Sequence, residues 1–166
     1  MTLTQKESSL IKDLKGQEKL CIDKYTKYAA DAKDPQLKTL FTQMAQTEQQ
    51  HLNTLTQIES GTVPQMNSNS GGCNQTAQSC PNGQCGNHRF TATYNIAGSP
   101  DKDNDCFLCT DMLTTEKHAS SLYDTCIFEF KDEGIRTVLN HIQKEEQEHG
   151  KKIYDYMAVN GMYSAA

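Results

Sequence analysis

The sequence predicts an all-α protein in which two similar helical hairpins form a four-helix bundle. Apolar residues recur every three or four positions through both ends of the chain, the periodicity of an amphipathic helix. The two ends repeat one another, and a long polar segment separates them. At 166 residues, the chain has the length of a single domain, which we expect to cover 1–166.

The first hairpin is expected over residues 4–60. Its first helix, about 4–32, carries an apolar stripe that includes Leu10, Leu14 and Tyr25. The second helix, about 35–60, begins after Asp34, because a proline such as Pro35 fits the first turn of a helix but breaks its interior.

The second hairpin is expected over residues 105–160. One helix carries the apolar positions from Cys109 to Phe130, and the other carries those from Ile135 to Met157. A break at 132–134 separates these two helices, and Gly161 is suited to end the last one.

Residues 61–104 are expected to be a crossover loop. These 44 residues hold six of the ten glycines and three of the four prolines, a composition typical of loops. Within them, Phe90–Ile96 alternates apolar and polar residues and is expected to lie extended. If the helices on either side of the crossover run parallel, it must travel roughly 40 Å along the bundle.

The two hairpins are copies related by a shift of 98 residues, without a gap from Asp13/Asp111 to Ile58/Tyr156. Repeated apolar positions are enough to make two hairpins pack alike, so the repetition of polar residues indicates a chemical role. The residues identical in both copies are Asp13, Glu18, Lys19, Tyr25, Lys33, Asp34, Thr39, Glu48, Gln49 and His51 in the first.

Each hairpin contains Glu-x6-Tyr on its first helix and Glu-x2-His on its second. These spacings put each pair on one helical face. Every glutamate lies about 15 residues from the turn of its hairpin, so all four should meet at one level of the bundle. The predicted metal ligands are Glu18, Glu48, His51, Glu116, Glu146 and His149.

Buried carboxylates cost several kcal/mol unless they are paired or bind metal. No lysine or arginine lies on the same stripes, so two metal ions are the predicted partners of the four glutamates. One glutamate from each of two helices and Glu-x-x-His from each of the other two is the di-metal arrangement of carboxylate bundles. Two iron ions are the predicted cofactor, and the same ligands serve manganese or zinc.

A structural origin of this pattern is the alternative to metal binding. A single Glu-x-x-His on a helix is usually a surface coincidence, and a decayed duplicate would no longer hold metal. Two copies in phase with the core favour the metal site. Glu145 and Glu148 are expected on the solvated face, and three histidines without a repeat partner are expected to be ordinary polar residues: His88, His118 and His141.

Tyr25 and Tyr123 lie two turns after Glu18 and Glu116. They are either plain core aromatics or donors to the ligand carboxylates. Their repetition favours phenol hydrogen bonds from just outside the ligand set.

The seven cysteines suggest a second chemistry. Exposed crossover thiols that form disulfides are one reading, and a zinc site from Cys80, Cys85, Cys106 and Cys109 is the other. Cys21 and Cys126 are expected to be small core residues. The cysteines with these possible disulfide or zinc roles are Cys73, Cys80, Cys85, Cys106 and Cys109.

The duplicated Glu-x6-Tyr and Glu-x2-His resemble the rubrerythrin branch of the ferritin-like superfamily. More specifically, EKLCIDKYTKYAADAKDPQLKTLF, TEKHASSLYDTCIFEF and HIQKEEQEHGKKIYDYM resemble bacterial spore coat proteins of the coat F type, over about 1–66 and 106–163. The resemblance implies a ferritin-like bundle deposited in the endospore coat. Rubrerythrins also carry a rubredoxin module with two CxxC knuckles, and this chain has one CxxC, Cys106–Cys109.

The leading functional hypothesis is a di-metal spore coat protein that reacts with peroxide or oxygen and so protects against oxidants. A di-iron or di-manganese peroxidase or oxidase is the corresponding enzyme class. The alternative is a structural coat protein, cross-linked through its crossover cysteines, whose metal site only stabilises the fold. Iron storage in a cage is a weaker third idea.

The expected partners are the chain itself and other spore coat proteins. The net charge of −5 argues against nucleic acid. No run approaches the roughly 18 apolar residues of a membrane span, and MTLTQKESSL has no apolar stretch of a secretory signal. Synthesis in the cytoplasm followed by deposition in the spore coat is the expected route.

Overall fold

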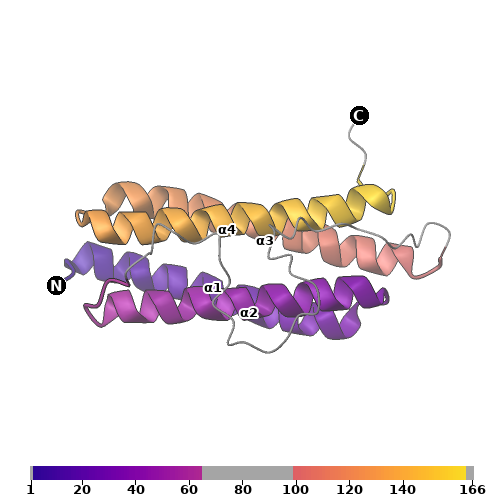
Figure 1. The fold of residues 1–166 in the computed structure, drawn as a ribbon, viewed down its shortest axis with the longest axis horizontal. Helices are drawn as coiled ribbons and strands as arrows, with labels where there is room; N and C mark the ends of the chain where they lie inside the picture. The colour runs from indigo at the N-terminus through magenta and orange to yellow at the C-terminus, as the bar shows by residue number, and fades with distance from the viewer. Residues whose placement is uncertain (1, 65–98, 164–166) are drawn as a thin grey trace, which may run out of the picture.

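The computed structural model describes residues 2–64 and 99–163, and within these ranges it contains four helices and no strand. They are α1 (Gln5–Asp31), α2 (Pro35–Glu59), α3 (Lys102–Glu129) and α4 (Glu133–Val159). The helices lie along one long axis, with α1 packed on α2 and α3 on α4 (Figure 1). The predicted all-α bundle is therefore confirmed, whereas the stretch Phe90–Ile96 lies outside the described residues.

Three of the four helices begin at a side chain that caps their free backbone amides. Thr4 and Glu7 form a reciprocal capping box at the start of α1. Asp34 accepts a 2.8 Å hydrogen bond from a backbone N–H of α2, and Pro35 follows it in the first turn. Asp132 caps α4 in the same way at 3.0 Å. The short connections within both hairpins therefore end where a cap starts the next helix.

The helix bounds of the second hairpin differ from the expected ones. α3 begins at Lys102 rather than near residue 105. Its first turn contains Asp103 and Asp105, whose negative charges interact favourably with the positive end of the helix dipole. α4 begins at Glu133, so Gly134 lies inside its first turn and not in a break. Gly161 follows the end of α4 with φ of +60°, the conformation expected of a glycine stop.

Two acidic residues brace the turns of the opposite hairpin. Asp105 at the start of α3 accepts hydrogen bonds from the amides of Lys33 (2.8 Å) and Asp34 (2.9 Å), between α1 and α2. Glu7 at the start of α1 accepts one from the amide of Lys131 (3.1 Å), between α3 and α4. Glu7 and Asp105 are themselves 98 residues apart, so the repeat extends six residues further towards the N-terminus than the pair Asp13/Asp111.

The apolar core has two clusters, one towards each end of the bundle. The first contains Phe41, Met112 and Tyr156, and the second contains Leu55 and Leu139. The six predicted metal ligands belong to neither cluster although all of them are buried, and they form a polar layer in the core. None of the described helices is both long and apolar enough to cross a membrane.

Candidate metal centre

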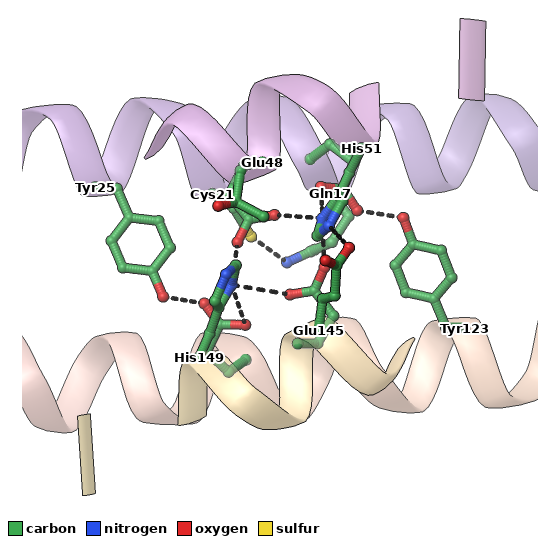
Figure 2. Close-up of polar contacts among 12 residues, drawn as sticks. Gln17, Cys21, Tyr25, Glu48, His51, Tyr123, Glu145 and His149 are labelled. Carbon is green, nitrogen blue, oxygen red and sulfur yellow. Dashed lines mark hydrogen bonds and ion pairs between the residues drawn. The ribbon is translucent and has the colours of Figure 1, made fainter. Parts of the chain in front are cut away.

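The structure brings the six predicted ligands together in the middle of the bundle (Figure 2). Each side chain is at most 3% exposed. Every helix contributes, because the pattern of the first hairpin is repeated in the second. The contributions are Glu18 from α1, Glu48 and His51 from α2, Glu116 from α3, and Glu146 and His149 from α4.

These residues form two overlapping groups that could each hold a metal ion. The first group is Glu18, Glu48, His51 and Glu146, and the second is Glu48, Glu116, Glu146 and His149. Within each group, one ligand atom from every residue lies within 4.8 Å of the others. Glu48 and Glu146 belong to both groups, so each could contact both ions if two were bound. The sequence placed these two glutamates in the Glu-x2-His motif but did not indicate that they are shared between two groups.

Both histidines direct the same ring nitrogen into the layer. Nδ1 of His51 lies 3.0 Å from Oε1 of Glu146 and 3.1 Å from Oε2 of Glu48. Nδ1 of His149 lies 2.8 Å from Oε1 of Glu48. An Nδ1 ligand on each ring thus faces the shared carboxylates.

The donor set fits a pair of divalent cations. Among the described residues, buried oxygens of all four glutamates have no partner in hydrogen-bond geometry. Nδ1 of His149 has none either, and its short distance to Glu48 is an ion-pair contact. Within the described ranges, the bases at ion-pair distance from these carboxylates are His51 and His149, with no lysine or arginine. Unpartnered buried carboxylates are costly, and two divalent cations would balance four negative charges.

Without cations, the four carboxyl groups resist ionisation. Burial is the main cause, and it raises the pKa of Glu18 to about 7. Burial and the charge of neighbouring glutamates also raise the pKa of Glu48, Glu116 and Glu146. Metal binding must therefore displace protons from this layer.

The two histidines differ in the carboxylates around them, and of the two only His51 contacts Glu145. Nε2 of His51 lies 2.9 Å from Oε2 of Glu145. Burial works against the charged form of His51, but the carboxylates around its ring, Glu145 and Glu146 foremost, outweigh burial and hold its pKa well above the usual range. For His149, burial prevails and lowers the pKa to about 4.

The expectation that Glu145 lies on the solvated face is wrong. Its side chain is only 33% exposed, and its Oε2 lies at hydrogen-bond distance from Nε2, the outer nitrogen of His51. The repeat could not indicate this role, since the equivalent position of the first hairpin is Thr47. The one sequence feature that could have indicated a role for Glu145 is its position directly before Glu146.

The other residues expected away from the centre lie at the surface where they are described. The Glu148 side chain is 56% exposed and His118 is exposed. His141 is also at the surface, with Nε2 3.4 Å from Glu145. His88 lies outside the described residues.

The two repeated tyrosines donate to carboxylates of the other hairpin. Tyr25 donates to Oε1 of Glu116, and Tyr123 donates to Oε1 of Glu18. Figure 2 shows one tyrosine on each side of the layer. Burial, with the adjacent negative charge, raises both phenol pKa values well above the usual range, so these hydroxyls stay protonated as donors.

The cysteines within the described residues are free thiols. Cys106 is half-buried, and Cys109 is fully buried in the apolar core. Cys21 and Cys126 are buried as expected, and Cys21 accepts a 3.4 Å contact from the Gln17 amide. The disulfide and zinc hypotheses stay predictions because three of their residues lie outside the described ranges: Cys73, Cys80 and Cys85.

Comparisons with known proteins found one family model and one curated relative. Residues 104–166 match the family model of the Coat F domain. An uncharacterized protein of Bacillus subtilis (strain 168), YusN, is 36% identical over 61 residues, which are 37% of this chain and 56% of YusN. The chain thus spans about half the length of this curated relative. No solved structure matches. The part with α3 and α4 is similar to the Coat F domain.

Proposed function

We propose that this chain is a spore coat protein whose ferritin-like bundle holds two divalent metal ions and reacts with peroxide or oxygen. The observation that supports the metal pair is the sharing of Glu48 and Glu146 between two ligand groups. The match of residues 104–166 to the Coat F domain supports the location in the coat.

The internal repeat extends this proposal to the first hairpin. The family model matches residues 104–166, which hold most of α3 and all of α4. However, α1 and α2 carry the same glutamates, tyrosine and histidine at a constant shift of 98 residues. Tyr25 and Tyr123 donate across the two halves, so the hairpins form one layer together. A di-metal site then needs both hairpins of this chain.

Two ferrous ions would supply the two electrons that reduce one peroxide molecule to water. The residues of the chain prepare the site for that chemistry. Glu48 and Glu146 reach both positions. Hydrogen bonds from Tyr123 and Tyr25 hold one oxygen each of Glu18 and Glu116, and the second oxygen of each carboxylate has no hydrogen-bond partner. The apolar clusters on either side limit access of bulk water.

Anaerobic loading with Fe²⁺ followed by peroxide tests this function. The wild-type chain should take up two iron ions and oxidise both with one equivalent of peroxide, seen as ferric absorbance. Glu48→Ala should lose iron and reaction together, whereas the exposed neighbour variant Gln49→Ala should keep both. A wild-type chain without stoichiometric iron contradicts metal binding, and a loaded chain that leaves peroxide untouched contradicts the reaction.

A structural role for the centre is the second candidate. Its ligands come from all four helices, so bound ions would tie the α1–α2 pair to the α3–α4 pair. Cysteines of the crossover would then join neighbouring chains in the coat. In that case metal raises the melting temperature without peroxide turnover, and electrophoresis without reductant shows ladders that collapse when reductant is added.

A further inference from the structure

A pocket of about 340 Å³ lies between α3 and α4, beside the candidate metal centre. Two of the six predicted ligands, Glu116 and Glu146, line it. Ser120 and Gly150 also line it, and both are half-buried. The pocket therefore lies directly beside two residues of the buried layer, although Oε2 of Glu116 and both carboxylate oxygens of Glu146 are themselves closed off from solvent.

The first hairpin carries much larger residues at the equivalent positions. A shift of 98 residues relates Ser120 to Ile22 and Gly150 to Leu52. Ile22 and Leu52 are also half-buried, so they occupy the same level of α1 and α2. The ligand residues are repeated while these two neighbours are not. The two faces of the centre are thus equal in ligands and unequal in the bulk that covers them.

The size of the pocket suits small molecules. A water molecule takes about 30 Å³ in the liquid, so the volume corresponds to on the order of ten waters. Ligand pockets for larger organic molecules begin at about this size. Peroxide, oxygen and small anions such as azide fit easily.

We propose that small exogenous ligands reach the metal centre through this pocket, on the α3–α4 face, because Gly150 and Ser120 leave it open. This inference rests on the proposed function, since it requires the two metal ions. It assigns Gly150 a role in access, distinct from the binding of metal.

Gly150 can be replaced without strain in the helix. A Cβ atom there would meet Cδ1 of Leu113 at 3.6 Å and Cβ of Glu116 at 3.9 Å, which are ordinary contacts. A leucine side chain would extend from this position over the pocket. Gly16 on α1 offers the matched control, because it is exposed and a Cβ there would have no neighbour within 4 Å.

Azide binding to the Co²⁺-loaded protein tests the access route. Wild type, Gly150→Leu, Ser120→Ile and Gly16→Leu are loaded with cobalt, and the rate of azide association is followed by stopped-flow absorbance. We expect Gly150→Leu and Ser120→Ile to slow association at least about tenfold with unchanged cobalt content. Gly16→Leu should behave as wild type. Gly150→Ala, the mildest change, should slow it two- to threefold.

The outcomes separate this inference from the proposed function. If Gly150→Leu and Gly150→Ala hold cobalt and bind azide at the wild-type rate, the access route is wrong and the metal site stands. The same holds if the Gly16→Leu control slows azide as much as Gly150→Leu does. If wild type takes up no cobalt, the access route and the metal site are both wrong.

Discussion

Glu145 makes the two histidines of the centre unequal. Its carboxylate lies on Nε2 of His51, on the far side of the ring from Nδ1, which faces the buried carboxylates. Among the described residues, the ion pairs of His149 involve its Nδ1 alone. A carboxylate on the outer nitrogen of a ligating histidine fixes the ring and increases its basicity. The group with His51 should therefore bind metal more tightly than the group with His149.

Glu145→Gln should weaken one of the two metal-binding steps by about 10–100-fold and leave the other near its wild-type value. Calorimetric titration with Zn²⁺ resolves the two steps. Glu148→Gln is the control on the same helix, since that side chain is 56% exposed and points away from the layer. Equal weakening of both steps, or no change in either, would contradict an orienting role for Glu145.

At the scale of the elements, the first turn of each hairpin's opening helix holds the turn of the other hairpin. Asp105 is fully buried at the start of α3, and its two carboxylate oxygens accept the amides of Lys33 and Asp34. Glu7 accepts a corresponding hydrogen bond from the amide of Lys131, in the turn before α4. These bonds fix where α2 and α4 begin, and hence the height at which Glu48 and Glu146 enter the layer.

Asp105→Ala should lower the free energy of unfolding by about 1–3 kcal/mol for each amide that loses its acceptor in the protein interior. Urea denaturation of the metal-free chain measures the change. Asp103→Ala removes another acidic residue from the same first turn, but Asp103 is exposed, so its effect should stay within about 0.5 kcal/mol. Similar losses in the two variants would rule out the brace.

At the scale of the whole molecule, the metal-free bundle should become less stable as the pH rises from about 5 to 7. Unfolding returns Glu18 from a pKa of about 7 to the ordinary 4.5, so the folded state holds extra protons in this window. Each extra proton makes the free energy of unfolding fall by roughly 1.4 kcal/mol per pH unit. His149, with its lowered pKa, acts in the opposite direction, but it is one group against four raised carboxyls.

Urea denaturation at several pH values, with chelator and with saturating metal, measures this dependence. The chelated protein should lose stability between about pH 5 and about pH 7. With metal, the trend should disappear or reverse, because cations favour the ionised carboxylates and bind more tightly as protons leave. Stability of the chelated protein that increases over this range would show that the carboxyls do not hold extra protons.

The fold and the six clustered residues could be predicted because the same pattern occurs in both hairpins. Helical periodicity fixes which face each residue shares, and the repeat of Glu18, Glu48 and His51 in the second hairpin marks them as more than surface residues. Features without a repeat were not predictable. The position equivalent to Glu145 in the first hairpin is Thr47, and the contact of Glu145 with His51 arises only when α2 and α4 pack together. The brace by Asp105 has a repeat partner in Glu7, but it was not predictable because it depends on two turns that meet only in the folded protein.

The crossover shows another limit of the sequence. Turn-forming residues indicate where a helix cannot continue, but they do not fix where the next one begins. Acidic side chains next to the loop, Asp103 and Asp105, extend α3 back to Lys102 because they suit a helix N-terminus. Local charge therefore favours a start earlier than the boundary that composition placed near residue 105.

Native mass spectrometry during a Co²⁺ titration tests the shared di-metal centre most directly. Wild type should bind two ions per chain. Glu18→Ala removes a ligand of one group and should leave one tightly bound ion, whereas Glu48→Ala removes a ligand of both groups and should weaken both. A wild-type chain that binds no ion or a single ion, or a Glu48→Ala chain that still binds two as tightly as wild type, would contradict a centre bridged by Glu48.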